Sequence, residues 1–208
     1  MHIPDGIIPL AQATIYWVVS IIFLLIISFK LSKDKMFNKQ VVLTAVLTAA
    51  TVVATSVSIP SPMGIPMHFF LIPLVVMILG LYKGSLVSFL SLVFQSIFLG
   101  MGGITTLGAN FLVMGIILSL CVYFVYNLFL DVNNSVAIFL STLIGIMGAT
   151  FAQIFILMLT NTTSFNVLLA SLLPFYLVVG ILEGLINIFI LGFIKRVRPE
   201  ILGLSADT

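Results

Sequence analysis

The 208-residue chain contains two histidines, and one of them, His2, directly follows the amino-terminal methionine. The α-amine of Met1 and the amide nitrogen of His2 close a five-membered ring on a metal ion, and the same amide closes a six-membered ring with the imidazole Nδ1. Three nitrogens from two residues then lie in one plane. Square-planar, all-nitrogen ligation favours Ni(II) or Cu(II) over Zn(II), which prefers a tetrahedron.

The second histidine, His68, is the expected fourth ligand, because it opens a predicted span on the same face as the amino terminus. The sequence therefore predicts a metal site made of Met1, His2 and His68. Two other interpretations stay open. A histidine at a helix end is often only a hydrogen-bonded structural residue. Thioethers with histidine favour Cu(I) instead, and three methionines are expected near this face: Met63, Met67 and Met101.

Further polar residues are expected around this site. Asp5 is a nearby exterior carboxylate, and the glycine-rich loop 100–110 contains Gly103, Thr105 and Asn110. A flexible hairpin is one interpretation of the loop. The other is that its small residues let backbone pack over a buried ion and exclude water, since irregular backbone at membrane depth is tolerated where it lines a cavity.

Glu183 is the one carboxylate well inside a predicted span, and intramembrane carboxylates are costly and usually functional. It lies beside Gly184 in a pattern of small residues that allows close helix packing. Candidate partners within the bundle are Gln95, Asn110 and Gln153. A structural polar contact and a direct role in handling the substrate both stay open.

These residues must be positioned by a membrane protein. Hydrophobic residues make up 62% of the chain and charged residues 7%, which excludes a soluble enzyme, a nucleic-acid binder and a disordered chain. The apolar runs are too long and continuous for a barrel, so the fold class is an all-α polytopic helical bundle. At about 20 apolar residues per spanning helix, about seven transmembrane helices are predicted: 9–29, 41–59, 69–81, 85–99, 111–130, 136–159 and 167–194.

With seven spans, all the basic residues fall on one side of the membrane: Lys30, Lys33, Lys35, Lys39, Lys83, Lys195, Arg196 and Arg198. The positive-inside rule makes that side cytoplasmic, with the N-terminus outside and the C-terminus inside. We expect one membrane domain over 1–208. It comprises an exterior metal-binding tail at 1–8, the bundle at 9–194 and a cytoplasmic tail at 195–208.

Three motifs carry a family resemblance: Met-His-Ile-Pro-Asp-Gly at 1–6, Gly-Gly-Ile-Thr-Thr-Leu-Gly-Ala-Asn at 102–110, and Glu183 with Gly184. Together the chain resembles the CbiM/NikM family, the substrate-binding membrane components of energy-coupling factor transporters for cobalt and nickel. The resemblance covers essentially the whole chain. It implies a seven-helix bundle with an exterior N-terminus inserted into the core, and a metal held at the positions of Met1, His2 and His68.

The resemblance also implies partners: a transmembrane coupling subunit, two ATPase subunits and often a small accessory membrane protein. The chain has no Walker-type loop, so we expect it to be no enzyme, with ATP hydrolysis on the partner chains. Ala45 and Ala49 resemble a docking surface for the coupling subunit, and simple helix packing is the alternative. Ni(II) or Co(II) is the expected cargo in the plasma membrane of a prokaryote, with no organic cofactor and no nucleic acid.

Nickel and cobalt are not distinguished. Many family members have small polar residues just before the later histidine, whereas residues 64–67 here are Gly-Ile-Pro-Met, and such neighbours tune metal affinity. Two other classes stay open. A self-contained channel or carrier needs a polar path, for which the cytoplasmic half offers little beyond Glu183, Asn127 and Asn187. A membrane enzyme needs a larger catalytic cluster than two histidines and one glutamate.

Overall fold

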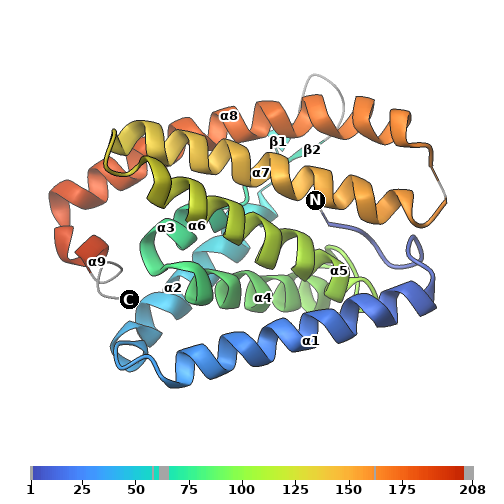
Figure 1. Cartoon of the computed structure of the whole chain (residues 1–208), viewed down its shortest axis with the longest axis horizontal. Helices are drawn as coiled ribbons and strands as arrows, with labels where there is room; N and C mark the ends of the chain where they lie inside the picture. The colour runs from blue at the N-terminus through green and yellow to red at the C-terminus, as the bar shows by residue number, and fades with distance from the viewer. Residues whose placement is uncertain (1, 58, 61–65, 162, 204–208) are drawn as a thin grey trace.

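The computed structural model is a bundle of helices and describes residues 2–57, 59–60, 66–161 and 163–203 (Figure 1). The helices are α1 Leu10–Ser32, α2 Phe37–Ser56, α3 Ile72–Leu79, α4 Leu81–Phe98, α5 Leu107–Phe111, α6 Leu118–Phe129, α7 Asn134–Met158, α8 Phe165–Val197 and α9 Pro199–Gly203. A π-helical segment, Leu112–Ile117, joins α5 to α6. Two short strands, β1 Ile59–Pro60 and β2 Pro66–Met67, pair antiparallel, with Ile59 opposite Met67.

The prediction of a multi-pass, all-helical membrane protein is confirmed. Within the described residues, five helical stretches are long and apolar enough to cross a membrane: Leu10–Ser32, Leu81–Phe98, Leu107–Phe129, Asn134–Met158 and Phe165–Val197. Gln40–Ser56 is a shorter apolar helix, and α3 has eight residues, about 12 Å of rise. Each of the seven predicted spans contains a helix, but the number of full crossings stays a prediction.

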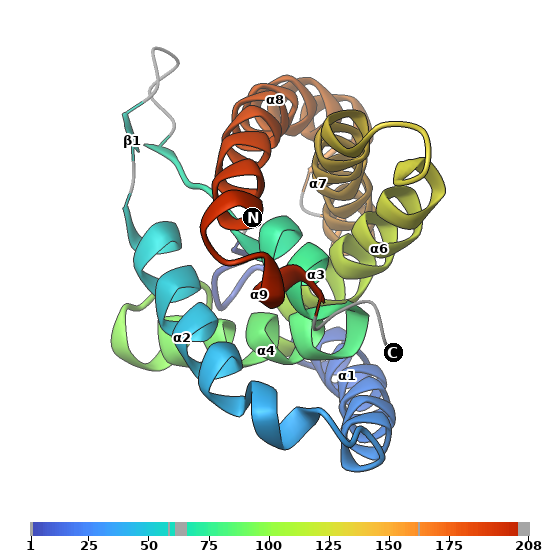
Figure 2. The ribbon, with the colours of Figure 1, turned by 90° about the vertical axis from the view of Figure 1, so that its left-hand side faces the viewer.

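The short helix α3 lies at the centre of the bundle, and the longer helices surround it (Figure 2). All eight of its residues are buried. Pro73 occupies its first turn, where the missing N–H costs no hydrogen bond. Gly80, at φ 79°, ends the helix and leads directly into α4. The predicted span 69–81 is therefore a half-length core helix, preceded by an extended segment that contains His68.

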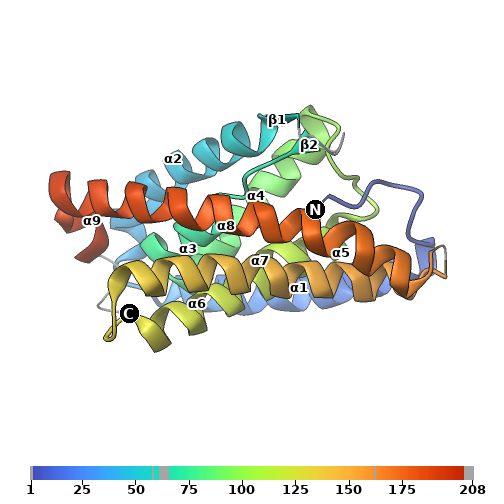
Figure 3. The ribbon, with the colours of Figure 1, turned by 90° about the horizontal axis from the view of Figure 1, so that it is seen from above.

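The helix α1 lies along one side of the bundle (Figure 1 and Figure 3) and packs against α5. Ser20 donates to the carbonyl of Gly108 at 2.8 Å, and the Trp17 indole donates to the carbonyl of Ile104 at 3.1 Å. A Cβ at Gly108 would lie 2.8 Å from the backbone of Trp17. A glycine here lets the two backbones approach, so the start of α5 is held against α1.

One end of the bundle contains the α1–α2 connection, the α3–α4 junction and the C-terminal end of α8 (Figure 1). These are the segments that contain the basic residues of the chain. An ion pair of 2.8 Å between Lys83 and Asp34 joins two of them. The N-terminal segment 2–9 and the α7–α8 connection lie toward the opposite end. Which end faces the cytoplasm stays a prediction.

We predict that Gly108→Ala separates α1 from α5, because its methyl group would overlap the Trp17 backbone. Overpacking of this kind costs about 1–3 kcal/mol, measured as a lower apparent melting temperature in detergent. The matched control is Gly192→Ala in α8, where a Cβ meets nothing within 4 Å. Equal melting temperatures for the two variants would contradict the close α1–α5 contact.

Candidate metal centre

The N-terminal segment 2–9 is folded back onto the bundle and held there by its own backbone. The amide of Ile3 donates to Asn110 Oδ1 at 2.8 Å, and Asn110 Nδ2 donates back to the carbonyl of Ile3 at 3.0 Å. The hydroxyl of Thr106 also donates to that carbonyl, at 2.7 Å. Ile3 and Asn110 are both buried. Asn110 thus satisfies both backbone groups of the residue next to His2, which allows the segment to lie inside the bundle.

Asp5 fixes the same segment to the glycine-rich loop. Its carboxylate accepts the amides of Ile104, Thr105 and Thr106 at 3.0–3.1 Å and the Thr105 hydroxyl at 2.5 Å. These hydrogen bonds, the Thr105 hydroxyl first among them, hold the pKa of Asp5 below its ordinary value. A Cβ at Gly103 would overlap the carboxylate. Gly103, Thr105 and Asn110 therefore meet the N-terminal segment, as the closing interpretation of the loop expects.

The imidazole of His2 ends a chain of hydrogen bonds whose direction can be followed. The Thr55 hydroxyl donates to the carbonyl of Thr51 at 2.7 Å, so it accepts from Gln95 Nε2. Gln95 Oε1 then faces His2 Nε2 at 2.9 Å. Because that oxygen can only accept, Nε2 of His2 must carry the proton. The network therefore leaves the lone pair of the neutral ring on Nδ1, the atom that the chelate requires.

The second imidazole, that of His68, also lies beside Thr55. The Nδ1 atom of His68 is buried and has no hydrogen-bond partner among the described residues, while the backbone of Thr55 hydrogen-bonds the ring. Burial lowers the pKa of His68 and lowers that of His2 to about 4. Both rings are therefore neutral at pH 7 and can offer a lone pair.

Glu183 does not contact the partners that the sequence suggested. Its buried carboxylate accepts the backbone amides of Phe70 at 2.8 Å and Leu71 at 2.9 Å. Leu71 has a left-handed φ of 57°, a conformation that costs energy for a side chain of this size. The candidate partners Gln95, Asn110 and Gln153 do not hydrogen-bond this carboxylate, whose two bonds go to backbone amides just after His68. Glu183 thus joins α8 to the segment that follows His68.

Three predicted residues lie wholly or partly outside what the structure describes. They are Met1, Met63 and the side chain of Met67. Within the described residues, no three His, Cys, Asp or Glu side chains gather as a metal cluster. The predicted set contains only two such side chains, and its other donors are backbone nitrogens. Gln95 was predicted as an intramembrane polar residue and a candidate partner of Glu183, and not as a contact of His2. Its bond to His2 joins residues 93 positions apart, and no local pattern marks it.

Ala45 and Ala49 lie on the exposed side of α2. They line a groove of about 520 Å³ between α2 and α4, whose other walls include the apolar side chains Val53, Leu90 and Phe94. The two alanines are therefore exposed at the surface and are not buried against other helices of the chain.

A multi-pass bundle with two neutral, half-buried imidazoles beside an inserted N-terminal segment suits a membrane protein that handles transition metals. Comparison with known proteins agrees with this class. The model of the CbiM family, described as the cobalt uptake substrate-specific transmembrane region, matches residues 2–201. The chain therefore belongs to the CbiM family, and the predicted membership is confirmed.

Relatives and solved structures agree. The chain is 33% identical to a putative fused nickel transport protein NikMN of Archaeoglobus fulgidus, over 99% of this chain and 69% of that protein. It is 30% identical to the cobalt transport protein CbiM of Clostridium tetani, over 98% and 89% of the two chains. A solved structure described as a transition metal transporter superposes with a TM-score of 0.85 at 26% identity, covering 95% of this chain and 93% of that one.

We predict that Gly103→Ala expels the Asp5 carboxylate and loosens residues 2–6. Hydrogen–deuterium exchange of that peptide should become faster. Asp5→Ala should have the same effect, because it removes the acceptor that holds the loop amides. Residues in one contact are non-additive, so the double variant should exchange no faster than either single variant. Additive effects would show that Gly103 and Asp5 act independently.

Proposed function

We propose that this chain is the substrate-capturing membrane subunit of an ATP-driven uptake transporter for Ni(II) or Co(II), with the ion as cargo. One observation carries the proposal: the network from Thr51 through Thr55 and Gln95 leaves Nδ1 of His2 as an acceptor. The buried, unpartnered Nδ1 of His68 supports it. Family membership makes a transported metal the natural ligand for the two atoms.

The proposed ligand set comprises the Met1 amine, the His2 amide nitrogen, the His2 imidazole and the His68 imidazole. The amide loses its proton on binding, so the peptide between Met1 and His2 becomes part of a planar chelate. All-nitrogen planar ligation suits Ni(II) and discriminates against tetrahedral Zn(II). The bonds from Asn110 hold the backbone of Ile3, the residue after His2, which reduces the entropy lost when the ion binds.

Orientation and partners complete the proposal. The bundle crosses the membrane seven times in a prokaryotic plasma membrane, with the N-terminal segment outside and the basic end in the cytoplasm. The chain hydrolyses no ATP itself. Two ATPase subunits, a transmembrane coupling subunit and, in some assemblies, a small accessory membrane protein supply the energy. The groove at Ala45 and Ala49 offers the coupling subunit an apolar surface of small residues.

The proposal predicts that a single residue added before Met1 abolishes tight binding, because the chelating amine becomes an amide. Titration calorimetry with Ni(II) and Co(II) on the purified chain measures this. His2→Ala should be equally damaging, since it removes the imidazole of the six-membered ring. His68→Ala leaves three planar nitrogens and an open corner, so weak residual binding is expected.

An extension after Thr208 is the control, and it should leave affinity unchanged. If the N-terminally extended protein binds the ion as tightly as the native chain, the amine is not a ligand and the proposed chelate is wrong.

A separate prediction concerns the tautomer of His2. Gln95→Leu removes the acceptor for Nε2–H, and loss of such a partner behind a metal ligand typically costs about 10–100-fold in affinity. The matched control is Gln153→Leu, because Gln153 is also a buried glutamine but makes no hydrogen bond with His2. The absorption bands of bound Ni(II) should shift in the Gln95 variant only. Equal affinities for both variants would remove Gln95 from the site.

A further inference from the structure

A second cavity lies at the basic end of the bundle. It has a volume of about 500 Å³ and lies between the end of α1, the α1–α2 connection, the α3–α4 junction and α6. Its charged lining residues are Lys30, Lys33, Asp34, Lys35 and Lys83. Four lysines against one aspartate give a formal excess of three positive charges. No other acidic side chain lines this cavity within the part of the chain that the structure describes.

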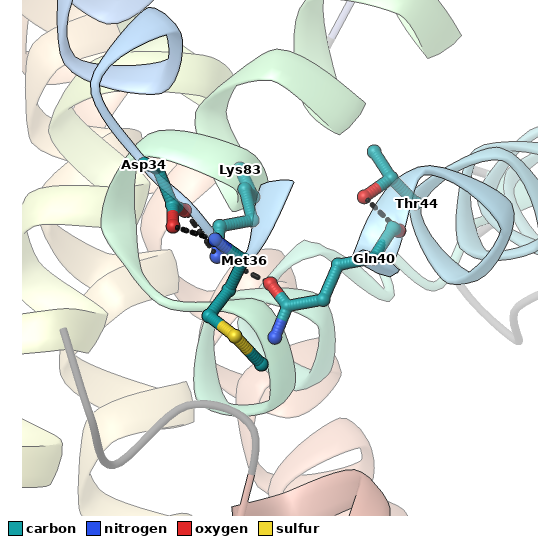
Figure 4. A network of polar contacts seen from close by, with 5 residues as sticks. All are labelled: Asp34, Met36, Gln40, Thr44 and Lys83. Atoms are coloured by element: carbon teal, nitrogen blue, oxygen red, sulfur yellow. Dashed lines mark hydrogen bonds and ion pairs between the residues drawn. The ribbon is translucent and has the colours of Figure 1, made fainter. Parts of the chain in front are cut away.

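Asp34 is part of a network of polar contacts with Lys83 and Met36 (Figure 4). Asp34 forms a 2.8 Å ion pair with the buried Lys83 and accepts the amide of Met36 at 2.8 Å. Lys83 also donates to Gln40. Burial opposes the ionisation of Asp34, but these hydrogen bonds outweigh it and hold its pKa below the ordinary value. Asp34 therefore neutralises Lys83. The three positive charges that remain in the cavity lining belong to Lys30, Lys33 and Lys35.

The helix that begins at this cavity adds to the positive potential. The first turn of α4 includes Leu81, Tyr82 and Lys83, which all line the cavity. Among the residues that the structure describes, no side chain caps the N-terminus of α4, and its first turn contains no acidic residue. The first amides of a helix lack partners within the helix, and the helix dipole favours an anion at this end. The lysines and the helix start therefore converge on one space suited to an anion.

The surface that leads to the cavity is apolar. Ile22, Leu25, Ile26 and Phe29 are exposed on the last turns of α1, directly before Lys30. Tyr82, at the cavity edge, has Lys30 at 5.9 Å from its ring. Aromatic and basic residues next to an exposed apolar helix are typical of the level of lipid headgroups. A phosphate in the cavity would thus have an apolar path for acyl chains beside it.

We propose that this cavity binds the phosphate headgroup of an anionic phospholipid, whose acyl chains lie along the exposed face of α1. The lysines Lys30, Lys33 and Lys35 pair with the phosphate, and the start of α4 donates from its free amides. A free phosphate ion would meet the same charges but would gain nothing from the apolar face. The adjacency of the lysines and α1 therefore favours the lipid.

The test is native mass spectrometry of the full chain in detergent, titrated with phosphatidylglycerol or with phosphatidylcholine of the same acyl chains. We expect phosphatidylglycerol to bind more tightly. The triple variant Lys30→Gln, Lys33→Gln, Lys35→Gln should weaken that binding by at least about tenfold, since each lysine near a lipid surface contributes about fivefold. The matched control is Lys195→Gln, Arg196→Gln, Arg198→Gln, which removes the same charge outside the cavity and should bind as the native chain does.

Several results would overturn the proposal. Equal loss in both triple variants would mean general charge attraction, and equal binding of the two lipids would exclude headgroup recognition. Full competition by millimolar inorganic phosphate would assign the cavity to a free anion. Unchanged lipid binding in the lysine variant, with loss of co-purifying partner subunits, would assign it to a protein contact. Melting temperatures of both variants verify that they are folded.

Discussion

The candidate metal centre depends on one constraint: the backbone of Ile3 is buried, so both of its polar groups need partners inside the bundle. An unpaired amide or carbonyl in this environment would cost several kcal/mol. Asn110 supplies a donor and an acceptor on one side chain, and Thr106 adds a second donor. With Ile3 in place, His2 on one side reaches Gln95 and Asp5 on the other reaches the loop amides.

The two imidazoles are held by neutral groups. Gln95 hydrogen-bonds His2, and the Thr55 hydroxyl accepts from Gln95. The backbone of Thr55 hydrogen-bonds the ring of His68. This network places no cationic side chain next to the two rings among the described residues that bond them. The carboxylate of Glu183 acts one step away, because it bonds the amides that follow His68.

The helices α2 and α4 are joined by polar contacts at both ends of their interface. At the metal-site end, Gln95 bonds Thr55, and at the basic end Lys83 bonds Gln40. In lipid there is no hydrophobic driving force for helices to associate. Interhelical hydrogen bonds are therefore a common means of holding them together. The interface thus links the candidate metal centre to the lysine-lined cavity through one pair of helices, and the exposed groove at Ala45 and Ala49 lies on it.

The sequence by itself determined the class of the protein, because hydropathy and charge position are local properties that composition and spacing express. A helix lies in each predicted segment, and the motifs at 1–6 and 102–110 identified the family. The tertiary structure alone decided the half length of α3, the left-handed Leu71, the role of Gln95 and the amide partners of Glu183. Those features come from contacts between residues about a hundred positions apart, where burial decides which polar groups must pair, and no short-range periodicity encodes that choice.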